Sequence, residues 1–192
     1  MRKTMFVAAV AAVLGATQAQ AQVFTLPFQS TARGGNSIGL YLSDGPGDLA
    51  VEGIWRRNMG SGNLGLRGGF ADLGDGYLLL GVDWRQALNL QTDPLDLGLT
   101  LGAQGAIGDN SGIGGQVGLI VGHTFAEQGL AITPFIHPRV AIAAPLSDNG
   151  DAEVDVLADL GADFDFSPNL SLRVGVSLGD GPDWGIGLAL RR

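Results

Sequence analysis

The sequence predicts an all-β fold, a closed antiparallel up-and-down β-barrel that crosses a membrane with about ten strands and short hairpin loops, with eight strands as the alternative. Three observations predict it. Large apolar residues alternate with small or polar residues at a two-residue period, turn-forming segments interrupt this alternation at regular intervals, and the chain begins like an exported protein.

The first 21 residues have the character of a cleaved signal peptide. They hold the only lysine, Lys3, then an apolar run over 5–16, then Ala19 and Ala21 at the expected cleavage site. A membrane-spanning helix needs about 20 apolar residues, so this run does not anchor the chain. We expect residues 22–35 to form an N-terminal periplasmic leader, with a short plug or an extra strand as alternatives. Residues 36–192 are expected to form a single barrel domain.

The composition of the remaining chain excludes several function classes. Removal of residues 1–21 leaves nine basic and 19 acidic residues, a net charge of −10, which makes nucleic acid a poor partner. The absence of cysteine excludes disulfides, thiolate metal sites and a lipid-modified cysteine. Nothing in the sequence indicates a cofactor, and we expect none.

Strand periodicity is clearest in two stretches. Over 95–102 four leucines alternate with Asp, Gly and Thr, and over 152–166 apolar residues alternate with aspartates. Connections rich in Asp, Gly and Pro separate the stretches and are too short for crossover helices. In chain order, the predicted strands are 37–43, 49–58, 63–71, 77–86, 95–107, 113–126, 130–143, 152–166, 170–179 and 184–191.

The connections also predict an orientation. With the N-terminus on the periplasmic side, alternate connections lie at the outer rim, and these hold most of the turn aspartates. Divalent cations prefer clustered carboxylates, and Asp109, Asp148 and Asp151 are the weak candidate ligands. Turns favour Asp and Gly for their backbone alone, and no segment matches an EF-hand loop, so we predict no dedicated metal site.

Aromatic residues support the same topology, because their side chains prefer the two interfaces of a bilayer. On the parity that would face lipid, five lie near the periplasmic ends of strands and two near the outer ends. The predicted girdle consists of Trp55, Trp84, Phe125, Phe164 and Phe166 on the periplasmic side and Phe70 and Trp184 on the outer side.

The opposite parity gives the barrel a charged lumen, where glycines also leave space. One interpretation is structural, a ladder of paired charges. The other is functional, because the four aspartates in 155–165 would line a hydrated path that favours cations. The predicted lumen charges are Glu52, Arg56, Arg67, Asp83, Arg85, Asp96, Arg139, Asp155, Asp159, Asp163, Asp165 and Arg173.

Catalytic motifs are weak. Residues 35–39 and 175–179 match the G-x-S-x-G pattern, but they fall in or beside predicted strands and not at the strand-to-helix turn that this motif requires. Residues 60–65 match the dinucleotide fingerprint with no helix to follow. His137 is a lone inward imidazole. We therefore predict that the protein is not an enzyme, with an outer-membrane hydrolase using His137 as the least favoured alternative.

A soluble periplasmic barrel that binds a ligand would show the same alternation with its apolar face inward. The residues that alternate with the apolar ones distinguish a soluble barrel from a membrane barrel. Soluble surfaces carry about 25–35% charged residues of both signs. This chain has 16% charged residues, 32 glycines and no lysine beyond residue 3, so the sequence favours a membrane barrel.

The chain resembles the small bacterial outer-membrane barrels of the OmpA-like and OmpX-like class. Its last strand, within residues 184–192 (WGIGLALRR), is similar to the assembly signal of that class in its alternation, and it departs by ending in two arginines instead of an aromatic residue. The resemblance implies a monomer in the outer membrane, with lipid, lipopolysaccharide and the barrel assembly machinery as partners. We expect a structural or surface-interaction role, with a narrow cation-leaning channel as the alternative.

Overall fold

A computed structural model describes residues 24–28, 35–46, 49–72, 76–88, 94–127, 129–146, 151–180 and 182–192. The regular structure of these residues is β-strand, and none of them belongs to a helix long and apolar enough to cross a membrane. The strands form a closed antiparallel up-and-down barrel of ten strands with a further strand outside the ring, which confirms the predicted fold class and strand number. The predicted signal peptide lies outside the described residues.

The strands follow the predicted order along the chain. They are β1 (Ser37–Asp44), β2 (Leu49–Met59), β3 (Gly62–Ala71), β4 (Tyr77–Leu88), β5 (Asp96–Ile107), β6 (Gly112–Gly122), β7 (Phe125–Glu127), β8 (Leu130–Pro145), β9 (Glu153–Ser167), β10 (Leu170–Leu178) and β11 (Trp184–Arg191).

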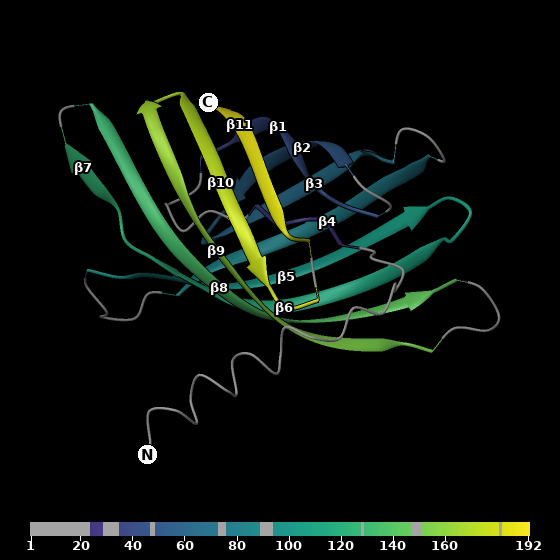
Figure 1. The fold of residues 1–192 in the computed structure, drawn as a ribbon. Helices are drawn as coiled ribbons and strands as arrows, with labels where there is room; N and C mark the ends of the chain where they lie inside the picture. Colours follow the sequence, from purple (N-terminus) through teal and green to yellow (C-terminus); the bar gives the residue numbers. More distant parts are fainter. Residues whose placement is uncertain are drawn as a thin grey trace, which may run out of the picture.

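Neighbouring strands of the ring are neighbours in the chain, and β1 pairs with β11 to close the sheet (Figure 1). β6 pairs directly with β8, and the short β7 pairs only with β8, outside the ring. Tight turns produce this hairpin topology. Between β2 and β3 the chain reverses at Gly60, whose φ of 68° is readily available only to glycine.

The single strand predicted over 113–126 is wrong in one respect, because the structure divides it into β6 and β7. The partner strand β8 has Pro134 opposite this break. His123 N donates to the Pro134 carbonyl at 3.3 Å, but proline has no N–H to return the bond. Pro138, four residues further along β8, coincides with a second gap in the β6–β8 pairing. This seam therefore lacks backbone hydrogen bonds that an uninterrupted strand pair would make.

The strands place apolar side chains outside the ring and charged side chains inside it. In β8, Val140 is 43% exposed, whereas its neighbour Arg139 is 2% exposed. The pattern recurs around the ring, whose strands carry thirty of the large apolar side chains that are exposed among the described residues. The buried ionisable side chains are Glu52, Arg56, Arg67, Asp83, Arg85, His137, Arg139, Asp159, Asp163 and Arg173.

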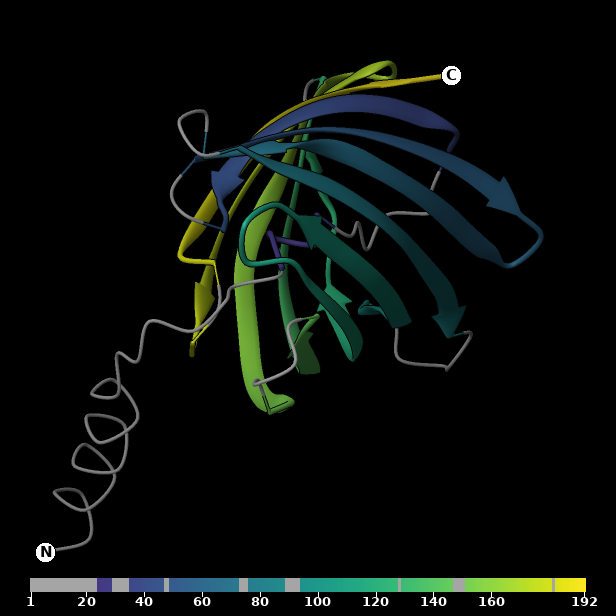
Figure 2. The ribbon, with the colours of Figure 1, turned by 90° about the vertical axis from the view of Figure 1, so that its right-hand side faces the viewer.

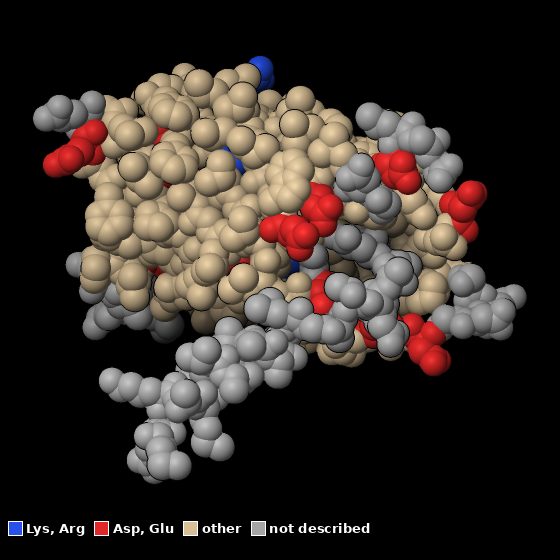
Figure 3. Space-filling model, in the orientation of Figure 1, with Lys and Arg blue, Asp and Glu red and all other residues tan. Residues whose placement is uncertain are grey.

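The two ends of the barrel differ in charge. The acidic end comprises the β1–β2, β3–β4, β5–β6, β8–β9 and β10–β11 connections, and its described acids include Asp72, Asp109, Asp151, Asp180 and Asp183. The opposite C-terminal end has the turns β2–β3 and β9–β10 and the last two residues, both arginine. In Figure 3 acidic atoms gather mainly over the right-hand part of the surface, and the wall beside them is largely uncharged.

Residues 24–28 lie inside the ring, where Figure 2 shows them in purple. All five residues are buried, with Thr25 at 0% exposure and Leu26 and Phe28 at 1%. The expected periplasmic leader does not describe these five residues, which form a plug, the alternative that the sequence left open. The physical reason is that a ring of ten strands is wider than side chains alone readily fill, and apolar residues at 24, 26 and 28 gain from burial there.

Candidate functional site

The candidate functional site is the lumen around residues 24–28, which we call the plug. The two-residue period of the strands carries the functional side chains inward. In β2, for example, Glu52 and Arg56 are buried in the lumen, whereas Gly53 and Trp55 between them are exposed outside. Strand register then brings these side chains level with partners on neighbouring strands.

Arg67 of β3 holds the middle of the plug. Its Nε and Nη2 donate to the two oxygens of Glu52, at 3.0 and 2.5 Å, and Nη2 also donates to the Leu26 carbonyl at 3.0 Å. Thr25 Oγ1 donates to Glu52 Oε2 at 2.5 Å, and Gln104 Nε2 donates to Thr25 Oγ1 at 3.1 Å. One buried cluster thus ties the plug to β2, β3 and β5.

Arg56 of β2 binds the next part of the plug. Its Nη1 donates to Asp83 Oδ1 at 2.5 Å and its Nη2 to Asp83 Oδ2 at 3.3 Å. The same Nη2 reaches the carbonyls of Pro27 and Phe28, both at 3.2 Å. Hydrogen bonds from a charged donor are stronger than neutral ones, so Arg56 binds the main chain of the plug firmly at Pro27 and Phe28.

Arg173 of β10 binds the same end of the plug as Arg56 does. Its Nε and Nη2 donate to the two oxygens of Asp163, the latter at 2.6 Å, and its Nη1 donates to the Phe28 carbonyl. Phe28 has φ of 45°, in the left-handed region that non-glycine residues seldom adopt. Its ring packs on Tyr41 with the centroids 4.3 Å apart. The two arginines and the ring contact together keep Phe28 in this conformation.

Side chains of the plug pack against glycine residues of the barrel wall. A Cβ at Gly114 would lie 2.3 Å from the Phe24 ring, and a Cβ at Gly185 would lie 2.5 Å from the Phe28 ring. Around these recesses the wall is apolar. Leu26 and Phe28 cluster with Tyr41, Ile54 and Ala189, and Phe24 clusters with Ala141 and Leu157.

A second buried cluster centres on Asp159 of β9. Its carboxylate accepts from Arg139 Nε at 2.9 Å and Nη2 at 3.1 Å, from His137 Nδ1 at 3.0 Å and from Ser177 Oγ at 2.7 Å. Arg139 Nη1 also donates to Gln116 Oε1 of β6 at 2.8 Å. This last bond crosses the β6–β8 seam, so side chains connect two strands whose backbone pairing is interrupted by proline.

His137 extends this cluster to β5. Its Nε2 lies 2.7 Å from Thr100 Oγ1, so a hydroxyl, an imidazole and the Asp159 carboxylate stand in line as in hydrolytic triads. All three side chains are at most 4% exposed. A Cβ at Gly118 would lie 2.6 Å from Nε2, which shows how closely the wall covers the imidazole. The wall encloses Thr100, His137 and Asp159 on the side from which a substrate would have to approach. We therefore interpret these three side chains as part of the packing of the lumen.

The four aspartates predicted on one strand do share the inner face of β9, but three of them bind arginines of other strands. The pairs are Asp159–Arg139, Asp163–Arg173 and Asp165–Arg191. Asp155 has no ion pair within the described residues. Because most of the negative charge of this row is offset, the row does not favour cations.

The other predicted lumen charges take their places in β4 and β5. Arg85 is 6% exposed on the inner face of β4, and Asp96 is half-buried at the start of β5. The two side chains attract each other electrostatically. They belong to the C-terminal half of the lumen.

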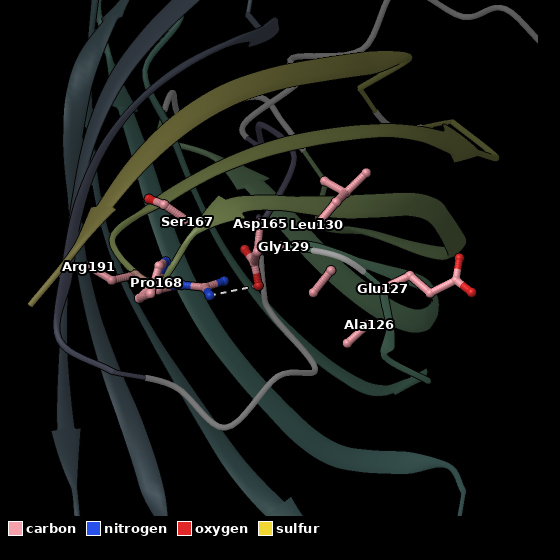
Figure 4. A pocket seen from close by; sticks show the side chains of 9 residues that line it. Ala126, Glu127, Gly129, Leu130, Asp165, Ser167, Pro168 and Arg191 are labelled. Atoms are coloured by element: carbon pink, nitrogen blue, oxygen red, sulfur yellow. Dashed lines mark hydrogen bonds and ion pairs between the residues drawn. The ribbon is translucent and has the colours of Figure 1, made fainter.

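An open hollow of about 430 Å³ lies at the C-terminal end, between the β7–β8 turn, the β9–β10 turn and the end of β11 (Figure 4). Asp165 and Arg191 point toward each other and form an ion pair of 2.8 Å, whereas the Glu127 carboxylate points away from them. The remaining lining is small or apolar. The lining residues are Ala126, Glu127, Gly129, Leu130, Ala131, Asp165, Ser167, Pro168 and Arg191.

The predicted girdle aromatics all lie on the outward parity of their strands. Trp55 is 41% exposed and Phe125 59% exposed near the C-terminal end, and Phe70 at 60% and Trp184 at 42% lie near the acidic end. Trp84, Phe164 and Phe166 complete the set near the C-terminal end.

The candidate metal ligands do not meet in one site. Asp109 and Asp151 belong to different connections of the acidic end, and Asp148 lies outside the described residues. Among the residues that the structure describes, no group of three or more His, Cys, Asp or Glu side chains is placed to hold a metal ion.

The sequence offered a short plug only as an alternative for residues 22–35, and it did not indicate the contacts that Thr25, Gln104 and Arg191 make. A signal was present for the plug: residues 24, 26 and 28 are apolar with the same alternation as the strands, and glycines recur on the inward parity of the wall. Arg191 belongs to a C-terminal pair that departs from the barrel pattern, and the structure gives it a carboxylate partner.

No protein-family model matches this sequence, and no curated protein matches it.

Proposed function

We propose that the protein is an integral β-barrel of a bacterial outer membrane with a structural or surface-interaction role and a closed lumen. The observation that carries the proposal is the inverted polarity of the ring, where the described residues place thirty large apolar side chains exposed outside and ten Asp, Glu, Arg and His side chains buried inside. Lipid is the solvent that favours this arrangement, because it accepts apolar side chains and favours a closed ring without free sheet edges.

The exposed side chains of the outer wall favour a membrane environment over an aqueous one. Soluble monomers rarely expose contiguous apolar patches larger than roughly a few hundred Å². Here the exposed apolar residues recur at every second position of adjacent strands, as in Ile186, Leu188 and Leu190 of β11 beside Ile38, Leu40 and Leu42 of β1. A soluble barrel with this wall would aggregate.

A closed structural barrel is supported more than an open channel. The plug fills the lumen between Phe24 and Phe28, and the arginines around it are paired with carboxylates. The short connections at both ends do not build the long loops of an adhesin. A scaffold or a compact surface for partners is the role that fits both features.

The proposal is tested on protein without residues 1–21, refolded into detergent and run on a gel with and without boiling. A closed barrel resists unfolding by the gel detergent, so the unboiled sample should migrate faster than the boiled one. Protein that stays monomeric and folded in buffer without detergent would overturn the membrane assignment.

A further inference from the structure

The plug is held by side chains and not by strand pairing. Residues 24–28 belong to no strand of the sheet. Their carbonyls accept hydrogen bonds from arginine side chains, at Leu26 from Arg67 and at Phe28 from Arg56 and Arg173. A strand of the ring would have to break a cooperative ladder on both edges to leave, whereas the plug would release a few separate bonds.

Departure of the plug would leave the lumen electrically balanced. Each arginine that binds a plug carbonyl also binds a carboxylate of the wall, and that partner stays in place. The pairs are Arg56–Asp83, Arg67–Glu52 and Arg173–Asp163. Uncompensated buried charge is the main cost of emptying a polar cavity, and here water need only replace the main-chain carbonyls and the Thr25 hydroxyl of the plug.

The plug also stores conformational strain that its release would relieve. Phe28 is not a glycine, yet it has φ of 45°. The contacts that enforce this conformation are the two arginines on its carbonyl and the ring packing on Tyr41. All of them exist only while the plug is in the lumen.

The recesses in the wall give the site a sequence preference. Gly114 and Gly185 make room for two aromatic rings four residues apart, and Gly175 lies beside Leu26, where a Cβ would be 3.1 Å from the leucine side chain. The arginines meanwhile read main-chain carbonyls, which any peptide offers. The preferred ligand is therefore a short peptide with aromatic residues at its first and fifth positions and an aliphatic residue between them.

We propose that the lumen is a binding site for a peptide of this pattern, that residues 24–28 are its tethered ligand, and that their departure opens an aqueous path through the ring. The path rests on the proposed function, whereas the peptide site does not. A ring of about eight strands is filled by its own side chains, and ten strands enclose a wider interior that the plug now occupies.

The first experiment measures whether the plug leaves the lumen. The chain has no cysteine, so Leu26→Cys gives the refolded protein a single thiol at a position that is 1% exposed. Adding Gly185→Ala puts a methyl group against the Phe28 ring, 2.5 Å from its nearest carbon, and should raise the rate of labelling by a water-soluble maleimide about tenfold. Equal rates with and without Gly185→Ala would overturn the proposal.

The matched control is Gly105→Ala in the same Leu26→Cys protein. Gly105 is on the outward parity of β5, and a Cβ there would have its nearest neighbour at an ordinary 3.6 Å, so the labelling rate should not change. If the labelling rate rose as much in this control as in Gly185→Ala, any added methyl group in the wall would loosen the barrel. That result would overturn the proposed peptide site.

Competition by peptide tests the site without a wall substitution. A five-residue peptide with the sequence of residues 24–28, in excess over the Leu26→Cys protein, should occupy the lumen whenever the tethered plug leaves and so increase labelling. A peptide of the same composition in scrambled order should have no effect. Equal effects of the two peptides would contradict the sequence preference.

Conductance tests the path. In a planar bilayer the Gly185→Ala protein should show discrete current steps that the peptide closes, and the unsubstituted protein should be closed most of the time. Faster labelling without current would overturn the path. Protein that stays monomeric and folded in buffer without detergent would instead overturn the membrane proposal, and labelling would then still decide the peptide site.

Discussion

The two faces of the barrel wall use the same strand in opposite ways. On β8, Arg139 is 2% exposed and bound to Asp159 and Gln116, whereas Val140 beside it is 43% exposed on the outer face. The inner face is specific, because most charged groups there have a defined partner at a defined register. On our proposal that the outer face contacts lipid, it requires only apolar character, since any such side chain suits a hydrocarbon solvent. Substitutions should therefore have large, partner-dependent effects inside and depth-dependent effects outside.

The largest effect is expected from Asp159→Ala. It removes the acceptor shared by Arg139, His137 and Ser177, and breaking a buried ion pair at one partner costs about 3–5 kcal/mol. Urea unfolding of the refolded protein, followed by tryptophan fluorescence, measures this loss. Asp155→Ala on the same strand is the control, with a change near zero because Asp155 has no ion pair within the described residues. Equal losses would contradict the partner-dependent account.

A charge on the outer face is expected to have the next largest effect. Val140→Arg places a cation at the middle of the stretch of β8 that pairs with β6, which costs about 2–4 kcal/mol at the middle of a bilayer and almost nothing at a water-exposed position. Unfolding in lipid vesicles measures the change. Asp109→Arg, in a connection of the acidic end, is the control and should be near neutral. If Val140→Arg is equally neutral, the outer wall does not face lipid.

A pair of substitutions separates two contributions to stability, the charge balance of the lumen and the hydrogen bonds to the plug. Arg67→Met alone leaves Glu52 buried without its cation and should destabilise strongly. Arg67→Met combined with Glu52→Met should return to within about 1–2 kcal/mol of the original stability, because a buried ion pair is often replaceable by apolar residues. Urea unfolding of both variants tests this. No recovery in the double variant would show that the bonds to Thr25 and Leu26, and not charge balance, dominate the stability.

The smallest effect is expected at the seam between β6 and β8. Gln116→Leu removes the neutral acceptor of Arg139 Nη1 and should cost about 1 kcal/mol. Its local effect should be clearer, since this bond crosses a seam interrupted at Pro134 and Pro138. Hydrogen exchange of β6 amides should become faster while exchange in β3 stays unchanged. Unchanged exchange in β6 would show that the side-chain bond does not support the seam.

The ring itself could be predicted from the sequence because its cause is local. A two-residue alternation, as in the leucines of 95–102, assigns each residue to a face, and short turns with Asp and Gly assign each strand to its neighbour. This reasoning gave ten strands, the inward charges and the outward aromatics. It divided the chain wrongly only at 113–126, because the interruption there comes from Pro134 on the partner strand and not from the strand itself.

The plug and the individual ion pairs could not be predicted in the same way. Which arginine meets which carboxylate depends on register across strands and on side-chain reach, as in Arg191 of β11, which binds Asp165 of β9. The plug depends on free volume inside a closed ring, a property of the whole barrel. Its residues show only a short apolar alternation before the first strand, which a leader outside the barrel would share.

Lipid contact of the outer wall is the central claim, and the three tryptophans test it most directly. Trp55, Trp84 and Trp184 all lie on the outward parity, so no tryptophan signal comes from the lumen. In vesicles of lipids with brominated acyl chains, the account predicts strong quenching of tryptophan fluorescence and little quenching by iodide in the buffer. Strong quenching by iodide with none by brominated lipid would contradict it.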